Sequence, residues 1–341
     1  MNGFDSNESA LPDENLRRAA RRAYCRVGLG VAAWMLVPEG VALLLQLITR
    51  TLAPGLFAAP WYVWAVQIFS SYVVGVPVAL LIFGTPETEA APTRTPKKMT
   101  FLGFFFFFCI ARALSLVGSQ IGNLLMNVAG FLRGAGYDNS LSTLLNQSGL
   151  LPILLVVVII GPIFEEIVFR YGAMRLLLPY GEVAAVFFSA LAFGLAHGNF
   201  FQFFYAFLVG CLFGYVYLRT GRLADSILLH IFFNFTGSFL PIFLLRAANL
   251  DALEDAATTN DLIALVLQNP LPFLFLLLFG LLSFAASVAG VIFLLTCFRR
   301  VKFAPSPLGR EEVRRAAFPN VGTVLLLLVS LLLFALSFIT A

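Results

Sequence analysis

Residues 150–172 read LLPILLVVVIIGPIFEEIVFRYG, and this stretch decides the class of fold. Its first half is almost entirely hydrocarbon, as is typical of a membrane-spanning helix. Glu165 and Glu166 follow, and Arg170 comes four residues after the second glutamate. A charged side chain in the middle of a spanning helix costs about 2.5–3.5 kcal/mol or more. We therefore expect these groups to face the interior of a helix bundle and to have partners or a function there.

The composition extends this interpretation to the whole chain. Of its 341 residues, 60% are hydrophobic and 12% are charged, whereas ordinary globular domains contain about 25% charged residues. The four cysteines occur singly, which favours small hydrophobic packing over a metal site or a disulfide. We predict an all-α fold, a polytopic transmembrane helical bundle of about eight or nine spans with a catalytic cavity inside it. The candidate spans are 27–48, 61–83, 101–124, 150–178, 181–198, 200–218, 223–245, 270–297 and 321–340.

The distribution of basic residues predicts the orientation of the bundle. If the N-terminus lies inside, nearly all of the 22 lysines and arginines fall on the inner side. Only Arg50, Arg133 and Arg246 fall outside, and Arg112 lies within a span. Such an excess follows the positive-inside rule. We therefore expect an integral membrane protein of a bacterial cell membrane, with a cytoplasmic N-terminus, the lipid bilayer as its surroundings and no nucleic-acid partner.

The polar residues divide the chain into four parts. A basic cytoplasmic segment (1–26) precedes N-terminal transmembrane helices (27–130), which include a segment along the inner membrane surface (84–100). Residues 150–245 hold most of the polar groups that interrupt apolar runs, and we expect this part to be the catalytic core. A C-terminal loop with further transmembrane helices follows (246–341).

Helical spacing separates the two glutamates. Residues four apart lie on the same face of a helix, so Glu166 and Arg170 are neighbours, with the acidic residue on the favoured N-terminal side. We expect Arg170 to hold Glu166 ionised and fixed. Glu165 is rotated by about 100° and projects into the bundle without a local partner. It is therefore the candidate for a general base.

The only two histidines of the chain, His197 and His230, lie in predicted spans after the glutamates. Phe193 shares a helical face with His197, and Asn234 shares one with His230. An imidazole and a carboxamide on one face can both donate hydrogen bonds, which is suitable for stabilising an oxyanion. Glu39 lies beside Pro38 in the first span, and we interpret it as a polar contact at a helix kink.

Helix lengths predict which of these groups meet. Glu165 lies about 22 Å before the turn near Pro179–Gly181, and His197 lies about 25 Å after it, so the two should be at similar depth. His230 is only about 12 Å beyond the turn at Gly221, and tilt or a non-helical start must bring it level. We also expect Gly161–Pro162 to kink the helix one turn before Glu165.

Three motifs carry a family resemblance. EEIVFR (165–170) matches EExxxR and contains Glu166 and Arg170, FGLAH (193–197) matches FxxxH, and HIFFN (230–234) matches HxxxN. In this order, within a polytopic membrane protein, they resemble the CPBP family of intramembrane proteases. That family comprises CAAX proteases and bacteriocin-processing enzymes related to the Ras-converting enzyme. The resemblance covers about residues 150–240 and implies an endopeptidase acting on membrane-associated or lipidated peptides or proteins.

The resemblance also implies roles for the site residues. Glu165 and His197 would activate a water, and His230 with Asn234 would form the oxyanion hole. Members are described both as metalloproteases and as metal-free glutamate proteases. If a zinc or another divalent cation is bound, Glu165, His197 and His230 are the candidate ligands, drawn from three helices. No cofactor is certain, but asparagine and arginine partners favour the metal-free mechanism.

Two other functions are compatible with these residues. A non-catalytic scaffold of the same family could bind and regulate a membrane protein, although every motif position holds a chemically competent residue. A proton-coupled transporter could also use buried glutamates and histidines, but the sequence shows no internal repeat.

Overall fold

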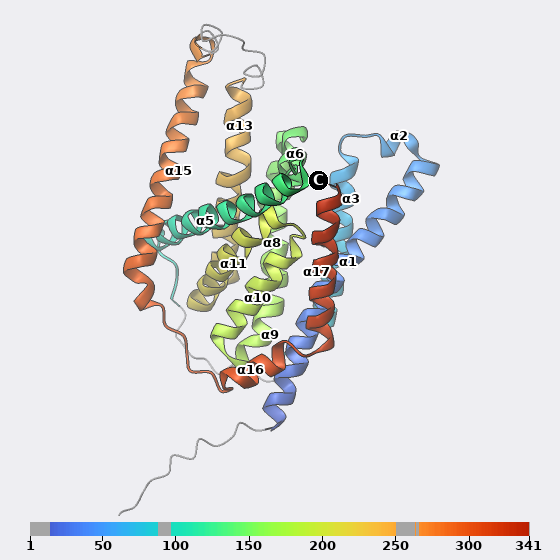
Figure 1. Cartoon of the computed structure of the whole chain (residues 1–341), viewed down its shortest axis with the longest axis vertical. Coiled ribbons are helices and arrows are strands. Elements are labelled where there is room, and N and C mark those ends of the chain that lie inside the picture. The colour runs from blue at the N-terminus through green and yellow to red at the C-terminus, as the bar shows by residue number, and fades with distance from the viewer. Residues whose placement is uncertain (1–13, 88–96, 250–262, 264–265, 341) are drawn as a thin grey trace, which may run out of the picture.

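The computed structural model describes residues 14–87, 97–249, 263 and 266–340, and every regular element in these ranges is helical (Figure 1). Eight helical segments are long and apolar enough to cross a membrane. The polytopic all-α fold is thus confirmed. Five of these segments contain the long helices α1 (Glu14–Leu52), α5 (Phe101–Arg133), α11 (Phe200–Thr220), α15 (Pro270–Cys297) and α17 (Val321–Thr340). Residues 88–96 of the expected inner-surface segment lie outside the described ranges.

The three remaining spans change their hydrogen-bond pattern along their length. One contains α3 (Tyr62–Gln67), η1 (Ile68–Gly75) and α4 (Val76–Phe83), and another contains α12 (Leu223–Asn234), η5 (Phe235–Phe239) and α13 (Leu240–Ala247). The span with the glutamates comprises α7 (Leu150–Pro152), η2 (Ile153–Ile160), α8 (Gly161–Glu166), η3 (Ile167–Met174), α9 (Arg175–Leu177) and η4 (Leu178–Tyr180). Here η1, η2, η3 and η5 are π-helical. Such wide turns are rare in proteins, and those that occur are often found at functional sites.

The π-helix η2 ends where the sequence predicts a kink. In a π-helix, each N–H donates to the carbonyl five residues earlier. The donor for the Val157 carbonyl would then be residue 162, which is a proline without an N–H. The Val157 carbonyl is therefore free to accept a hydrogen bond from another helix. Gly161 and Pro162 begin α8, the short α-helix that carries both glutamates.

The expected fifth span is shorter than a full crossing. It is α10 (Glu182–Ala196), which has 15 residues, while a spanning helix needs about 20. The helix ends directly before His197, Gly198 turns the chain with a φ of +67°, and α11 starts at Phe200. The turn between α10 and α11 is partly buried and places His197 at the end of a helix.

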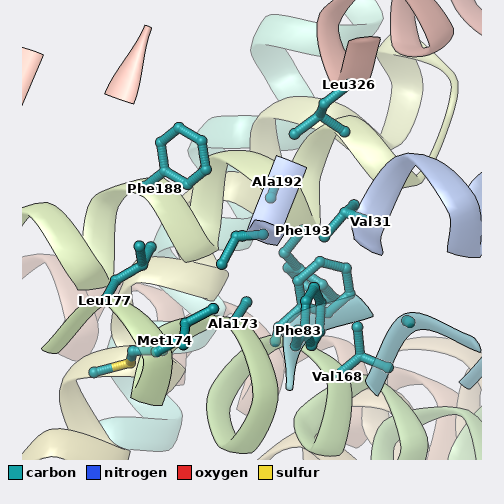
Figure 2. Close-up of a cluster of buried hydrophobic side chains, with 14 of the residues drawn as sticks. Val31, Phe83, Val168, Ala173, Met174, Leu177, Phe188, Ala192, Phe193 and Leu326 are labelled. Atoms are coloured by element: carbon teal, nitrogen blue, oxygen red, sulfur yellow. The ribbon is translucent and has the colours of Figure 1, made fainter. Parts of the chain in front are cut away.

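A hydrophobic cluster holds the helix of the glutamates against both ends of the chain. Figure 2 shows Val31 of α1, Phe83 of α4, Val168 of η3 and Leu326 of α17 in this cluster, together with side chains of α10. Helix α17 also packs along α1 without space between the backbones: a Cβ added at Gly28 would lie 2.3 Å from the carbonyl carbon of Gly322. The C-terminal span is therefore part of the core.

The described residues also include the shorter helices α2 (Pro54–Phe57), α6 (Ser140–Gln147), η7 (Phe298–Arg300) and α16 (Arg310–Ala317). Helix α16 lies at the end of the bundle where α1 begins (Figure 1), and Arg17 pairs with Glu312 there at 2.6 Å. We call this end of the bundle the basic end, because the arginines of α16 and of the first turns of α1 lie there. Helix α6 lies toward the opposite end (Figure 1) and is capped by the side chain of Asn139, which accepts hydrogen bonds from Leu141 N and Ser142 N.

Candidate active site

Glu166 and Arg170 form an ion pair in the interior of the bundle. Neither side chain is exposed at all, and Arg170 Nε lies 3.2 Å from Glu166 Oε2. Arg170 Nη2 also donates a hydrogen bond of 3.1 Å to the carbonyl of Gly210. Its guanidinium carbon lies 4.9 Å from the ring centre of Phe193, a cation–π distance. Removing one charge of such a pair leaves the other without compensation, so the two residues act as a structural unit.

His230 lies between the two glutamates. Its Nδ1 is 3.1 Å from Glu166 Oε1, and its Nε2 is 3.6 Å from Glu165 Oε2. The residue is 4% exposed, and its ring centre lies 4.7 Å from that of Phe213. Glu166 is thus shared between Arg170 and His230, a contact that the sequence analysis missed. The distance between His230 and Glu165 shows that the two residues lie at the same depth.

His197 is fixed by its own helix. It follows the last residue of α10, and its Nδ1 lies 2.8 Å from the carbonyl of Phe193, four residues earlier. A backbone carbonyl accepts hydrogen bonds, so Nδ1 carries the proton and Nε2 keeps a lone pair. Asn199 supports the turn by donating a hydrogen bond of 2.9 Å to the His197 carbonyl. The FxxxH spacing therefore sets both the tautomer and the orientation of this ring.

Asn234 is the last residue of α12, and its carboxamide crosses to the helix of the glutamates. Asn234 Nδ2 donates a hydrogen bond of 2.9 Å to the Val157 carbonyl, the group that Pro162 leaves without a donor. One amide hydrogen is used in this contact. The second hydrogen of the same nitrogen is available to a ligand.

Glu165, His197, His230 and Asn234 line one cavity of about 300 Å³. The cavity therefore collects the four candidate catalytic residues from α8, α12 and the turn after α10. Glu166 and Arg170 lie behind this surface and contact it through His230. Apolar residues of α6 and α11 form part of the remaining wall, and they include Leu141, Leu144, Ala206 and Val209. Such a pocket, mostly apolar with a few convergent polar groups, is typical of a site for a small ligand or peptide segment.

Five further polar residues line the cavity and were not among the candidate catalytic residues: Gln67, Tyr72, Gln202, Tyr205 and Ser238. Gln202 Nε2 donates a hydrogen bond of 3.0 Å to the Tyr205 hydroxyl, and the Tyr72 ring stacks on Phe164 with centres 5.0 Å apart. Gln67 and Tyr72 come from the span Tyr62–Phe83, which carries none of the three motifs. No spacing in the sequence connects that span to the glutamates.

The suggested metal ligands do not form a ligand group. Within the residues that the structure describes, no three histidine, cysteine, aspartate or glutamate side chains are arranged to hold a metal ion. His230 Nδ1 already contacts Glu166, and His197 Nδ1 contacts the carbonyl of Phe193. Asn234 and Arg170, which are also part of the arrangement, are not typical zinc ligands. In the described residues the three candidate ligands are thus not arranged as a metal-holding group, and we assign no chemical step to a metal.

Comparison with known proteins identifies the domain that carries this cavity. Residues 147–236 match the family model described as type II CAAX prenyl endopeptidase Rce1-like, a protease family. The matched range contains all seven fixed residues of the three motifs. A comparison with curated proteins and another with solved structures found no match. Residues 147–236 of this chain are therefore similar to the Rce1-like family of CAAX proteases, which is the resemblance that the three motifs predicted.

Proposed function

We propose that this protein is an intramembrane endopeptidase that hydrolyses peptide bonds in membrane-associated or lipidated peptides and proteins. One observation carries the proposal: Glu165, His197, His230 and Asn234 line the same cavity, and Glu165 Oε2 is 3.6 Å from His230 Nε2. A base, a second proton carrier and two hydrogen-bond donors are the groups that addition of water to a carbonyl requires. The protease family of the domain supports this activity.

In the proposed mechanism, Glu165 takes a proton from a water, whose oxygen attacks the peptide carbonyl carbon. His197 presents Nε2 to the cavity, because its Nδ1–H is held by the Phe193 carbonyl, and it shares or relays this proton. The carbon–nitrogen bond then breaks, and the leaving nitrogen takes the proton. The water oxygen ends in the new carboxylate.

His230 and Asn234 hold the oxyanion that forms during the attack. A protonated His230 can donate from both ring nitrogens, with Nδ1–H directed to Glu166 and Nε2–H available to the oxyanion. Arg170 and protonated His230 then balance Glu165 and Glu166, so the buried group of four is neutral. The free amide hydrogen of Asn234 provides the second donor.

We propose a metal-free, glutamate-dependent reaction. Asn234 and Arg170 favour this type, because neither residue is a typical zinc ligand. A site buried among spanning helices selects substrates that approach from the membrane. We further propose that the basic end faces the cytoplasm, since the arginines of α1 and α16 lie there.

Purified full-length protein, incubated with a library of membrane-anchored peptides, tests the proposal by mass spectrometry of the products. Single alanine substitutions of Glu165, His197, His230 and Asn234 should each lower the cleavage rate by about 100-fold or more. Glu311→Ala, at an exposed position of α16, is the control and should cleave like the wild type. Chelation of divalent metals should leave the rate unchanged. Absence of cleavage by the wild type would instead favour the non-catalytic scaffold.

A further inference from the structure

A second cavity of about 400 Å³ lies on another side of Glu165. It shares Gln67, Tyr72, Glu165 and His197 with the first cavity. Its remaining walls come mainly from α1, η1 and α17, and they include Trp34, Met35, Glu39, Ser71, Leu333 and Ser337. The family match covers none of these three elements. The presumed base therefore faces two spaces, and one of them is built by parts of the chain outside the matched domain.

The division of polar groups between the two cavities separates their roles. His230 and Asn234 line only the first cavity. A carbonyl under attack must lie there, because its oxygen has to reach these two donors. A bound peptide segment consequently fills the first cavity and displaces water from it. Glu165 and His197 stay in contact with the second cavity, which the peptide does not need.

Glu39 indicates that the second cavity contains water. It lies 13 residues after Arg26 in α1, about 20 Å further along the helix and away from the basic end. Its side chain is exposed, and no hydrogen bond or ion pair joins it to another residue in the described part of the chain. A carboxylate at this depth in hydrocarbon costs about 2.5–3.5 kcal/mol or more. Water in the cavity removes that cost.

Two hydroxyl groups provide further hydrogen-bond partners for water. Ser71 and Ser337 line the second cavity and not the first. Ser71 Oγ accepts a hydrogen bond of 2.8 Å from Gln67 Nε2, and Gln67 borders both cavities. A buried water usually makes about three hydrogen bonds. The serines, Gln67 and Glu39 together offer enough partners for a short file of waters that ends at Glu165.

We propose that the second cavity is the route by which water reaches Glu165 while the peptide fills the first cavity, and that Glu39 keeps this route hydrated. The inference depends on the proposed function, because hydrolysis consumes one water for each bond cleaved. The oxygen of that water enters the new carboxylate, and its hydrogens leave with the products. Glu39 exchanges no proton in this scheme. It is a positioning residue for water and needs only to be polar.

Cysteine labelling tests the route without requiring protease activity. Ser71→Cys is nearly isosteric and places a thiol in the second cavity. The control is Val73→Cys, two residues further along η1, where the Val73 side chain is 56% exposed on the outside of the bundle. Full-length protein in lipid nanodiscs is treated with a charged thiosulfonate, which reacts only where water reaches the thiol. Mass spectrometry of the peptide containing each site then measures its modification, separately from the native cysteines. Ser71→Cys should be modified about tenfold faster or more than Val73→Cys. Equal rates would refute the water route, whether or not the protein is a protease.

Kinetics then tests the role of Glu39. Glu39→Leu should lower kcat about tenfold and leave KM within about twofold, while Glu39→Gln should keep most of the wild-type rate. Filling the cavity by Ser337→Trp should lower kcat similarly, and Ala335→Trp, at an exposed position of the same helix, should not. Loss of activity in Glu39→Gln would show that the carboxylate itself reacts and would refute the hydration role. Full activity in both Glu39→Leu and Ser337→Trp would refute the route.

Discussion

Replacing Arg170 with methionine should destabilise the protein strongly, because it leaves the charge of Glu166 in the core. Both side chains are fully buried, and the pair is joined at 3.2 Å. Removing one partner of such a pair costs about 3–5 kcal/mol. The Gly210 carbonyl also loses its hydrogen bond from Arg170 Nη2. We expect Arg170→Met to lower the free energy of unfolding by this amount in a denaturant titration of the protein in mixed micelles.

A second substitution separates the structural effect from the chemical one. Adding Glu166→Gln removes the uncompensated charge, so the double variant should regain about 2 kcal/mol or more of the lost stability. The glutamine carbonyl can still accept a hydrogen bond from His230 Nδ1–H, but it cannot balance a protonated ring. Cleavage by the double variant should therefore stay at about 1% of the wild-type kcat or less.

An exposed ion pair is the control for this experiment. Arg314 Nε lies 2.8 Å from Glu311 Oε2 in α16, and both side chains are at least half exposed. Arg314→Met should change the free energy of unfolding by no more than about 0.5 kcal/mol. A double variant no more stable than Arg170→Met would refute the buried-charge explanation. A double variant with near wild-type kcat would refute the role of the Glu166 carboxylate beside His230.

Three further substitutions test individual contacts. Asn234→Ala removes an oxyanion donor and the bond to the Val157 carbonyl, and kcat should fall about 100-fold with little change in KM. Asn199→Ala removes the cap of α11 and the bond to the His197 carbonyl. It should cost about 1 kcal/mol of stability and lower kcat, and Asn199→Ser should restore most of the stability in thermal unfolding. A Cβ added at Gly322 would lie only 1.9 Å from the Cys25 carbonyl oxygen, so Gly322→Leu has no space for its side chain. It should separate α17 from α1 and destabilise the protein by about 1–3 kcal/mol, and an unchanged thermal midpoint would contradict this packing.

Features that depend on local spacing could be predicted from the sequence. The pair of Glu166 and Arg170 needs only an interval of four residues on a helix. The two side chains stay in contact although the helix becomes π-helical at Ile167. Long apolar runs likewise predicted the spans, because the bilayer sets a minimum length. The short α10 was the exception, since apolar composition does not show where a helix ends inside a membrane protein.

Contacts between distant segments could not be predicted. His230 and Glu166 are 64 residues apart, and their contact depends on helix tilt, which packing determines and composition does not. The bond from Asn234 to Val157 requires knowledge that η2 is π-helical, because only then does Pro162 leave this carbonyl free. Helix α6 was missed since its residues are not strongly apolar, although Leu141 and Leu144 line the cavity.

The proposed role of Glu165 as the base can be tested most directly with Glu165→Gln. Its side chain is 22% exposed, and its nearest charged partner is His230 at 3.6 Å, so the substitution should leave the thermal midpoint nearly unchanged. Cleavage of a peptide that the wild type cuts should fall by about 1,000-fold, while the dissociation constant of the same peptide stays within about twofold. A folded Glu165→Gln variant that cleaves within tenfold of the wild-type rate would contradict the assignment of Glu165 as the base.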